Sequence, residues 1–185
     1  MFVKIFNKSN DLATTYLQSA IKRVAYYKEL GDKTFAQISE ADFHFVPNKE
    51  SNSIAVIIQH MAGNMLSRWT DFLTTDGEKY WRNRDTEFEE QPLTQTQLID
   101  LWEKGWACFL NTLQQLSPED LLKTINIRQE GLLVIDAINR QLAHYPYHIG
   151  QIIYIAKIIK DSGWQTLSIA KDASQQYNQR LFFKK

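Results

Sequence analysis

The sequence predicts an all-α protein, a four-helix bundle with a long crossover connection between its second and third helices. Four long segments carry apolar residues at helical spacing, and hydrophobic residues make up 44% of the 185-residue chain. No internal repeat, low-complexity tract or Pro/Gly-rich linker divides the sequence. A chain of this length can bury a substantial core, so we expect one domain over residues 1–185.

The first predicted helix covers about residues 9–30, and Gly31 is its candidate stop signal. The second covers about residues 53–74. Ser53 and the two residues before it are N-cap candidates for this helix, and Gly77 follows its end. Both segments carry apolar residues near helical spacing, which indicates helices that pack one face on a core.

The third predicted helix starts after Thr94, where Gln97 completes a capping-box pattern, and continues through Leu113. The fourth covers about residues 134–162 and stops at Gly163. Between these two helices, residues 117–120 suit a single helical turn with proline at its first position. Residues 123–128 and 131–134 predict a small β-hairpin.

His144 and His148 are the most informative residues of the fourth segment. On a helix, a spacing of four residues places both imidazoles on one face, about 5–6 Å apart at Cβ. A third histidine, His60, lies in the middle of the second predicted helix. Three neutral imidazoles with one open position form a recurring site for a catalytic divalent metal. The pattern predicts a metal site, and an incidental surface or core pair is the alternative.

His60 and Pro146 each leave a question open. On a helical wheel His60 points away from the apolar stripe of its segment. Either this helix is contacted on several sides, or His60 is an exposed residue outside any site. Pro146 stands between the paired histidines, and inside a helix it removes the hydrogen bond to Leu142 at a cost of about 3 kcal/mol. A kink, a later helix start, or a distortion tolerated at a functional site would each accommodate it.

Charge and cysteine content disfavour some functions. The 21 basic and 21 acidic side chains cancel, which argues against non-specific nucleic-acid binding. The single cysteine, Cys108, cannot form an intrachain disulfide and fits a reducing compartment. Residues 1–8 lack the apolar core of a signal peptide, and no apolar stretch is long enough to span a bilayer. We therefore expect a soluble cytoplasmic protein that binds neither nucleic acid nor membranes.

Several longer motifs point to a family. One is the histidine within residues 57–65, and another is the histidine pair followed by Gly150-Gln151. Together with residues 72–78, 81–85 and 137–144, these motifs resemble the DinB-like superfamily of bacterial four-helix bundles. They are similar to a subgroup whose function is unknown, and the resemblance covers nearly the whole chain.

The resemblance implies a bundle, often a homodimer, that holds a divalent metal, nickel or zinc, on His60, His144 and His148. Members of the superfamily include transferases and isomerases that use low-molecular-weight thiols, and proteins described as metal-dependent hydrolases. We therefore expect a metal-dependent enzyme, either a hydrolase or a thiol-dependent transferase, that acts on a small-molecule substrate. The alternatives are a bundle that binds metal without turnover and a helical interaction module.

No Asp or Glu lies within one helical turn of these histidines in the sequence, so metal-bound water or thiolate is the expected nucleophile. Groups that accept the free N–H proton of each ring should orient it. The candidates by sequence proximity are Gln59, Asn64, Gln141 and Gln151. Arg82 and Arg84 are candidate substrate-binding residues, because a guanidinium binds carboxylate or phosphate bidentately. A loop held by Arg–Asp pairs is the alternative reading of these arginines.

Overall fold

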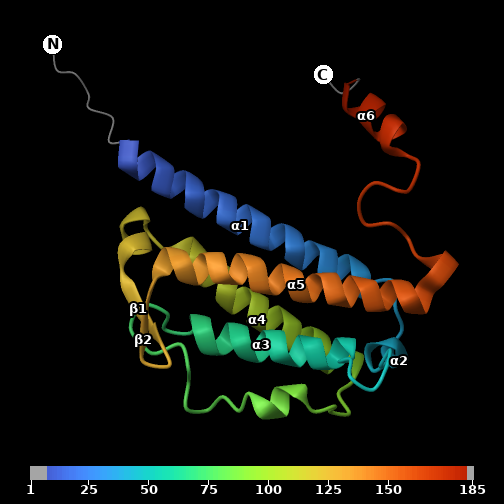
Figure 1. The fold of residues 1–185 in the computed structure, drawn as a ribbon, viewed down its shortest axis with the longest axis horizontal. Helices are drawn as coiled ribbons and strands as arrows, with labels where there is room; N and C mark the ends of the chain where they lie inside the picture. The colour runs from blue at the N-terminus through green and yellow to red at the C-terminus, as the bar shows by residue number, and fades with distance from the viewer. Residues whose placement is uncertain (1–7, 183–185) are drawn as a thin grey trace.

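The computed structural model describes residues 8–182, which are mostly helical with one small antiparallel sheet. Residues 1–7, on which the signal-peptide prediction depends, lie outside this range. In the described part, four long helices lie side by side (Figure 1). They are α1 (Lys8–Phe35), α3 (Ile54–Trp69), α4 (Gln95–Gln115) and α5 (Val134–Lys160). Within residues 8–182, none of the helices has both the length and the apolar character that a membrane crossing needs.

Shorter elements connect and follow these helices. Helix α2 (Glu40–Phe43) lies between α1 and α3, and the 3-10 helix η1 (Asp85–Phe88) lies in the long connection between α3 and α4. The 3-10 helix η2 (Pro118–Leu122) and strands β1 (Thr124–Ile127) and β2 (Glu130–Leu133) separate α4 from α5. The 3-10 helix η3 (Asp161–Gly163) and helix α6 (Ser174–Phe182) follow α5, and α6 extends away from the long helices (Figure 1).

The predicted hairpin is confirmed, and an acidic residue of the α3–α4 connection supports its turn. Strands β1 and β2 pair antiparallel. The turn residues Arg128 and Gln129 have φ values of 56° and 65°. This is a left-handed backbone conformation that residues other than glycine and asparagine rarely adopt. The Asp76 carboxylate accepts hydrogen bonds from both of their backbone N–H groups, at 2.9 and 2.8 Å. This contact fixes the connection against the hairpin.

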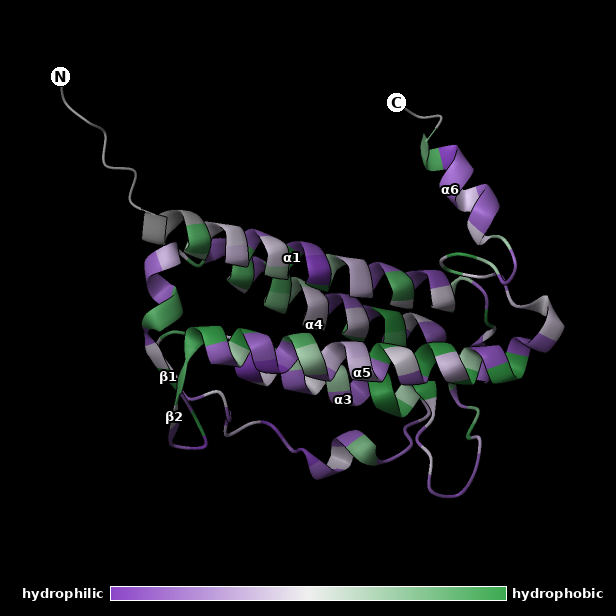
Figure 2. Cartoon of the chain, turned by 45° about the horizontal axis from the view of Figure 1, so that its top comes forward, coloured by the Kyte–Doolittle hydropathy of each residue, from purple (hydrophilic) through white to green (hydrophobic). Residues whose placement is uncertain are grey.

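The core lies between the four long helices. Hydrophobic and hydrophilic residues fall on different faces of these helices (Figure 2), and each contributes buried apolar residues to one cluster. Aromatic rings fill its centre, where they make edge and tilted contacts with centroids about 4.5–6.3 Å apart. The rings are those of Trp69, Trp102, Trp106, Phe109 and Tyr145.

The predicted start of the third helix is confirmed, while the ends of the first two are corrected. Thr94 caps α4 and Gln97 completes the capping box. Helix α3 ends at Trp69, earlier than predicted, because Thr70 adopts an extended conformation with φ −70° and ψ 128°. Helix α1 continues past Gly31 to Phe35, so Gly31 is not a stop signal. Its role is steric, since a Cβ there would overlap the buried Trp102 ring.

Helix α5 answers the question raised by Pro146. The helix begins at Val134, which excludes a later start, and it continues through Pro146 to Lys160. His144 and His148 therefore keep the helical spacing that the metal-site prediction requires.

Gly31 and Gly150, which lie in α1 and α5, should respond in opposite ways to substitution by alanine. Alanine favours a helix interior over glycine by about 1 kcal/mol. A methyl group at position 150 would meet no other part of the fold within 4 Å, so we expect Gly150→Ala to raise the free energy of unfolding. At Gly31 the added methyl would meet Trp102, whose Nε1 donates to Asp32 at 2.7 Å, and overpacking should cost about 1–3 kcal/mol. Urea unfolding of both variants tests this, and a gain in stability for Gly31→Ala would contradict it.

Candidate metal centre

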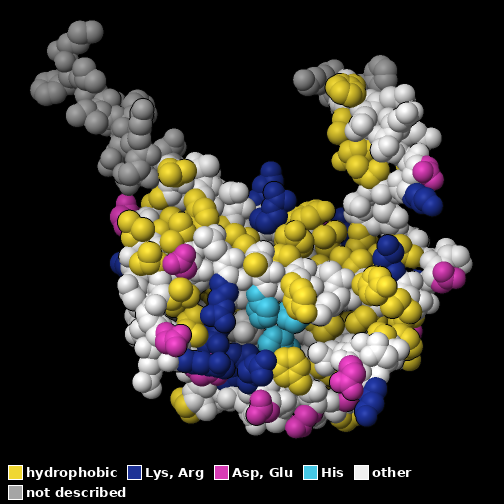
Figure 3. All heavy atoms as spheres, viewed as in Figure 1, with side chains coloured by type: hydrophobic (Ala, Val, Ile, Leu, Met, Phe, Trp, Pro, Cys, Tyr) yellow, Lys and Arg dark blue, Asp and Glu magenta, His cyan; other side chains and the backbone are white. Residues whose placement is uncertain are grey.

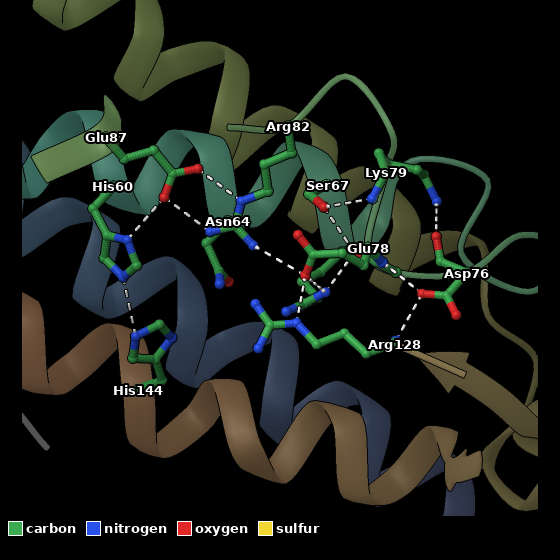
Figure 4. Close-up of polar contacts among 12 residues, drawn as sticks. His60, Asn64, Ser67, Asp76, Glu78, Lys79, Arg82, Glu87, Arg128 and His144 are labelled. Atoms are coloured by element: carbon green, nitrogen blue, oxygen red, sulfur yellow. Dashed lines mark hydrogen bonds and ion pairs between the residues drawn. The ribbon is translucent and has the colours of Figure 1, made fainter. Parts of the chain in front are cut away.

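Three histidines from two helices converge on one point. His60 comes from α3, and His144 and His148 come from α5. The His144 Nε2 atom lies 3.0 Å from Nε2 of His148 and 3.5 Å from Nε2 of His60. All three ligand atoms lie within 4.8 Å of one another. The rings of His60 and His144 face each other across the gap between α3 and α5 (Figure 4).

The other nitrogen of each ring faces an oxygen that can only accept a hydrogen bond. His60 Nδ1 lies 3.0 Å from Oε2 of Glu87. His144 Nδ1 lies 3.2 Å from Oε1 of Gln141, and His148 Nδ1 lies 2.8 Å from Oε1 of Gln151. Each Nδ1 must therefore carry the proton and donate it. This leaves the three Nε2 atoms with lone pairs that point toward one another.

Three converging lone pairs repel unless a cation lies between them, and the spacing suits a metal ion. In a tetrahedral site with metal–nitrogen bonds of about 2.0–2.1 Å, two ligand nitrogens lie about 3.3 Å apart. The two short Nε2–Nε2 distances, 3.0 and 3.5 Å, bracket this value. The three residues therefore fit a divalent metal, with one coordination position left for another ligand.

The pKa values of the paired histidines favour the neutral, metal-binding form of the rings. Burial, followed by the charges of His148, His60, Arg140 and Arg82, lowers the pKa of His144 from 6.5 to about 4. Burial is also the largest cause that lowers the pKa of His148, and the Gln151 hydrogen bond opposes it in part. Both imidazoles are neutral at pH 7, as a metal ligand must be.

His60 lies on a helix that is covered on nearly every side. Helix α3 contacts α2, α4, α5 and η1, and His60 is 5% exposed. The Phe88 ring of η1 packs against the His60 imidazole with a centroid distance of 4.6 Å. His60 points away from the apolar stripe of α3 and is still buried, because several elements contact this helix. It is therefore not an exposed residue outside the site.

Glu87 is the functional residue that sequence reasoning missed. Its carboxylate is buried in the α3–α4 connection, where Oε1 and Oε2 accept hydrogen bonds from Arg82 Nε and Nη2 at 2.7 and 2.9 Å. Burial would raise the pKa of Glu87, but the hydrogen bonds from Arg82 and His60 outweigh it and lower the pKa. Glu87 is thus an anion that orients the His60 ring, and both of its oxygens are engaged.

Figure 4 shows that this ion pair belongs to a longer polar network. Glu78 lies at its centre and accepts hydrogen bonds from Arg68 at 3.1 Å and from Arg128 at 2.9 Å. The Arg82 guanidinium also approaches Glu78, with Nη1 at 4.0 Å from Oε2. The network joins the histidines to the β1–β2 turn and fixes the connection that carries Glu87.

The four candidate orienting residues differ in whether they contact a histidine ring. Gln141 and Gln151 contact the histidine rings, whereas Gln59 and Asn64 do not. Gln59 Nε2 donates to the backbone of its own helix at Ala55, and Asn64 Oδ1 accepts from the buried Tyr145 hydroxyl at 3.0 Å.

The two candidate substrate-binding arginines differ in their burial and in their partners. The Arg82 side chain is 2% exposed and bound to Glu87, so it is not free to bind a substrate, because a structural ion pair occupies it. Arg84 is exposed, and its guanidinium lies 4.9 Å above the Phe88 ring.

The sequence held one weak signal for Glu87. Gly63 lies three residues after His60 on the covered helix α3, and a Cβ at this position would overlap the Glu87 carboxylate. A glycine inside a helix costs about 1 kcal/mol relative to alanine, so it can indicate close approach by another segment. Glycine alone does not say which residue approaches, and Glu87 is 27 residues away from His60 in the chain.

Removing one partner of the Arg82–Glu87 pair should destabilise the fold more than removing both. Glu87→Leu or Arg82→Leu leaves a buried charge without its partner, at an expected cost of about 3–5 kcal/mol. In the double variant neither charge remains, so its loss should be smaller than the sum of the single losses. Urea unfolding of the metal-free protein measures this coupling. The exposed pair Lys33–Glu29 is the control, with an expected coupling below about 1 kcal/mol. Additive losses at Arg82 and Glu87 would contradict the prediction.

The stability of the metal-free protein should fall as the pH is lowered from 6.5 to about 4. In this range the unfolded chain binds a proton at His144 that the folded protein does not bind, so protonation favours unfolding. Unfolding free energies measured with a chelator at several pH values test this dependence. A His144→Gln variant should show a shallower slope, and an unchanged slope would exclude His144 as the cause.

Comparison with known protein families identifies the family of this chain. Residues 11–173 match the family described as "Protein of unknown function (DUF1572)". A search of curated proteins gives no match. Because the family match covers most of the chain, this protein belongs to the DUF1572 family.

Proposed function

We propose that this protein is a metal-dependent enzyme of the DinB-like superfamily, in which a four-helix bundle holds nickel or zinc on His60, His144 and His148. The observation that carries the proposal is the convergence of three Nε2 lone pairs whose partner nitrogens all donate to fixed oxygens. A cluster of histidines without a metal role would gain nothing from this arrangement, since one ring would turn or share a proton.

Access to the site supports a catalytic role over a purely structural one. His144 and His148 are half-buried, and histidine side chains are visible on the surface of the molecule (Figure 3). Three protein ligands and an open position are typical of catalytic zinc sites, whereas structural sites carry four protein ligands. A small molecule can therefore reach the fourth position.

The chain's own residues favour thiol transfer over hydrolysis. A divalent metal supplies a Lewis acid that lowers the pKa of a thiol or of water. Glu87 orients His60 and stays ionised beside Arg82, so it has no free oxygen with which to take a proton from water. Among the described residues, no other carboxylate contacts the three histidines. A thiol, with a pKa of about 8.5, needs less help from a base than water does.

The purified protein should contain close to one equivalent of nickel or zinc per chain after loading. His60→Ala and His144→Ala should each lose the metal, because two imidazoles hold a divalent ion much more weakly than three. Elemental analysis of untagged protein measures the stoichiometry. The matched control is His44→Ala, since His44 bonds Glu90 and the Leu93 carbonyl and lies outside the cluster.

Retention of metal by the His60 and His144 variants would overturn the proposed site. Activity assays of the loaded protein then separate the remaining alternatives. Transfer of a thiol to an electrophile supports the transferase, and cleavage of an ester without a thiol supports a hydrolase. Full metal occupancy with a large loss of thermal stability on chelation, and no uptake of an exogenous ligand such as azide, would indicate a structural metal.

A further inference from the structure

We propose that the candidate metal centre selects a small molecule that carries a carboxylate, and that Arg140 binds this carboxylate while another atom of the molecule faces the three histidines. The inference rests on the proposed function, because it assumes a metal at the histidine cluster. It adds the chemical class of the ligand and a residue that determines specificity.

The charge of the site favours an anionic ligand. All three imidazoles are neutral ligands, so a divalent metal would keep its full charge. The nearby Glu87 carboxylate does not compensate it, because Arg82 already pairs with both Glu87 oxygens. A ligand with two negative groups, such as a thiolate and a carboxylate, would neutralise the site.

The arginines around the site fall into two groups. Three of them pair with buried or half-buried carboxylates: Arg68 and Arg128 with Glu78, and Arg82 with Glu87. Arg84 and Arg140 are exposed. Within residues 12–182, whose side chains the structure describes, neither arginine forms an ion pair or a side-chain hydrogen bond. The first group holds the fold, and the second can bind a ligand.

Arg140 lies on the same helix as the histidine pair, whereas Arg84 lies in the α3–α4 connection. Arg140 lies one helical turn before His144 on α5, so the two side chains are neighbours on one face. The Arg84 guanidinium instead lies 4.9 Å from the centroid of the Phe88 ring, which also packs on His60.

The surface around the histidines has a basic side and a hydrophobic side. Figure 3 shows Lys and Arg side chains to the left of the histidines and hydrophobic side chains to the right. Beyond Gln151 and Tyr147 lies a cleft of about 670 Å³. Among the described residues that line it, Glu50 is charged and none is Lys or Arg. The Glu50 carboxylate disfavours a second carboxylate in this cleft, which favours the basic side of the histidines for the charged end of the ligand.

The geometry of one guanidinium favours a carboxylate over a phosphate. A single guanidinium forms two parallel hydrogen bonds with the two oxygens of a carboxylate and balances its one charge. A phosphate monoester carries close to two negative charges at pH 7 and would need a second cation. Arg84 is held on Phe88 and does not offer that second charge at the same point.

The test uses the full-length protein loaded with cobalt(II), whose visible spectrum reports a new ligand. Two titrants have the same carbon chain length and differ at the end opposite the thiol: 3-mercaptopropionate ends in a charged carboxylate and 3-mercapto-1-propanol in a neutral hydroxyl. Wild type should bind the carboxylate more tightly. Arg140→Ala should weaken binding of 3-mercaptopropionate about tenfold, the scale of a lost charge-assisted hydrogen bond, and leave 3-mercapto-1-propanol unchanged. Arg140→Lys should retain part of the preference, because it keeps the charge without the bidentate geometry.

Arg180→Ala is the matched control, since it removes the same charge from α6, which buries no residues. It should bind both thiols as wild type does. Equal affinity of wild type for the two thiols, or an unchanged preference in Arg140→Ala, would overturn the inference while leaving the metal site intact. Stronger competition by inorganic phosphate than by acetate would contradict the carboxylate. Absence of a cobalt spectrum would overturn the inference and the proposed function together, and circular dichroism shows whether each variant is folded.

Discussion

Burial of the Glu87 carboxylate is the constraint on which the candidate metal centre depends. Removing an ion from water costs several kcal/mol, so a buried carboxylate must be paired and hydrogen-bonded. Here Arg82 supplies two hydrogen bonds and His60 supplies a third. The same contacts therefore hold the α3–α4 connection on the surface of α3 and fix the orientation of the His60 ring. The network around Glu78 and Asp76 continues this support to the hairpin.

Helix α5 provides its part of the site in a simpler way. His144 and His148 are one turn apart, and each has a glutamine three residues away: Gln141 before the first and Gln151 after the second. Helical spacing alone brings each glutamine beside its histidine. Two ligands and their two orienting groups thus come from one stretch of helix, which needs no long-range contact to align them. The long-range contact is needed only to add His60.

This difference explains what could be predicted from the sequence. Features that depend on local spacing were predictable: the Thr94 cap, the hairpin and the histidine pair. Sequence proximity named Gln141 and Gln151, which contact the rings, but also Gln59 and Asn64, which do not. Features that depend on packing were not predictable. Gly31 was predicted as a helix stop because the local sequence does not show its packing against Trp102, which lies 71 residues later in the chain. Glu87 has no spacing rule that relates it to His60. An ion pair of Arg82 was one of the two alternatives, but its partner could not be named because the folded connection sets it.

The charges of the ligands connect the structure of the site to its use. Structural zinc sites commonly include thiolates, whose negative charges balance the ion, and they close around it. This site offers three neutral imidazoles, an ion pair that is already neutral, and an exposed arginine nearby. A metal held in this way gains more from an added anion than a balanced metal would, since the surroundings are partly buried and screen charge poorly. This charge balance is why we propose that the site binds and activates an anionic ligand, which a stabilising metal would not require.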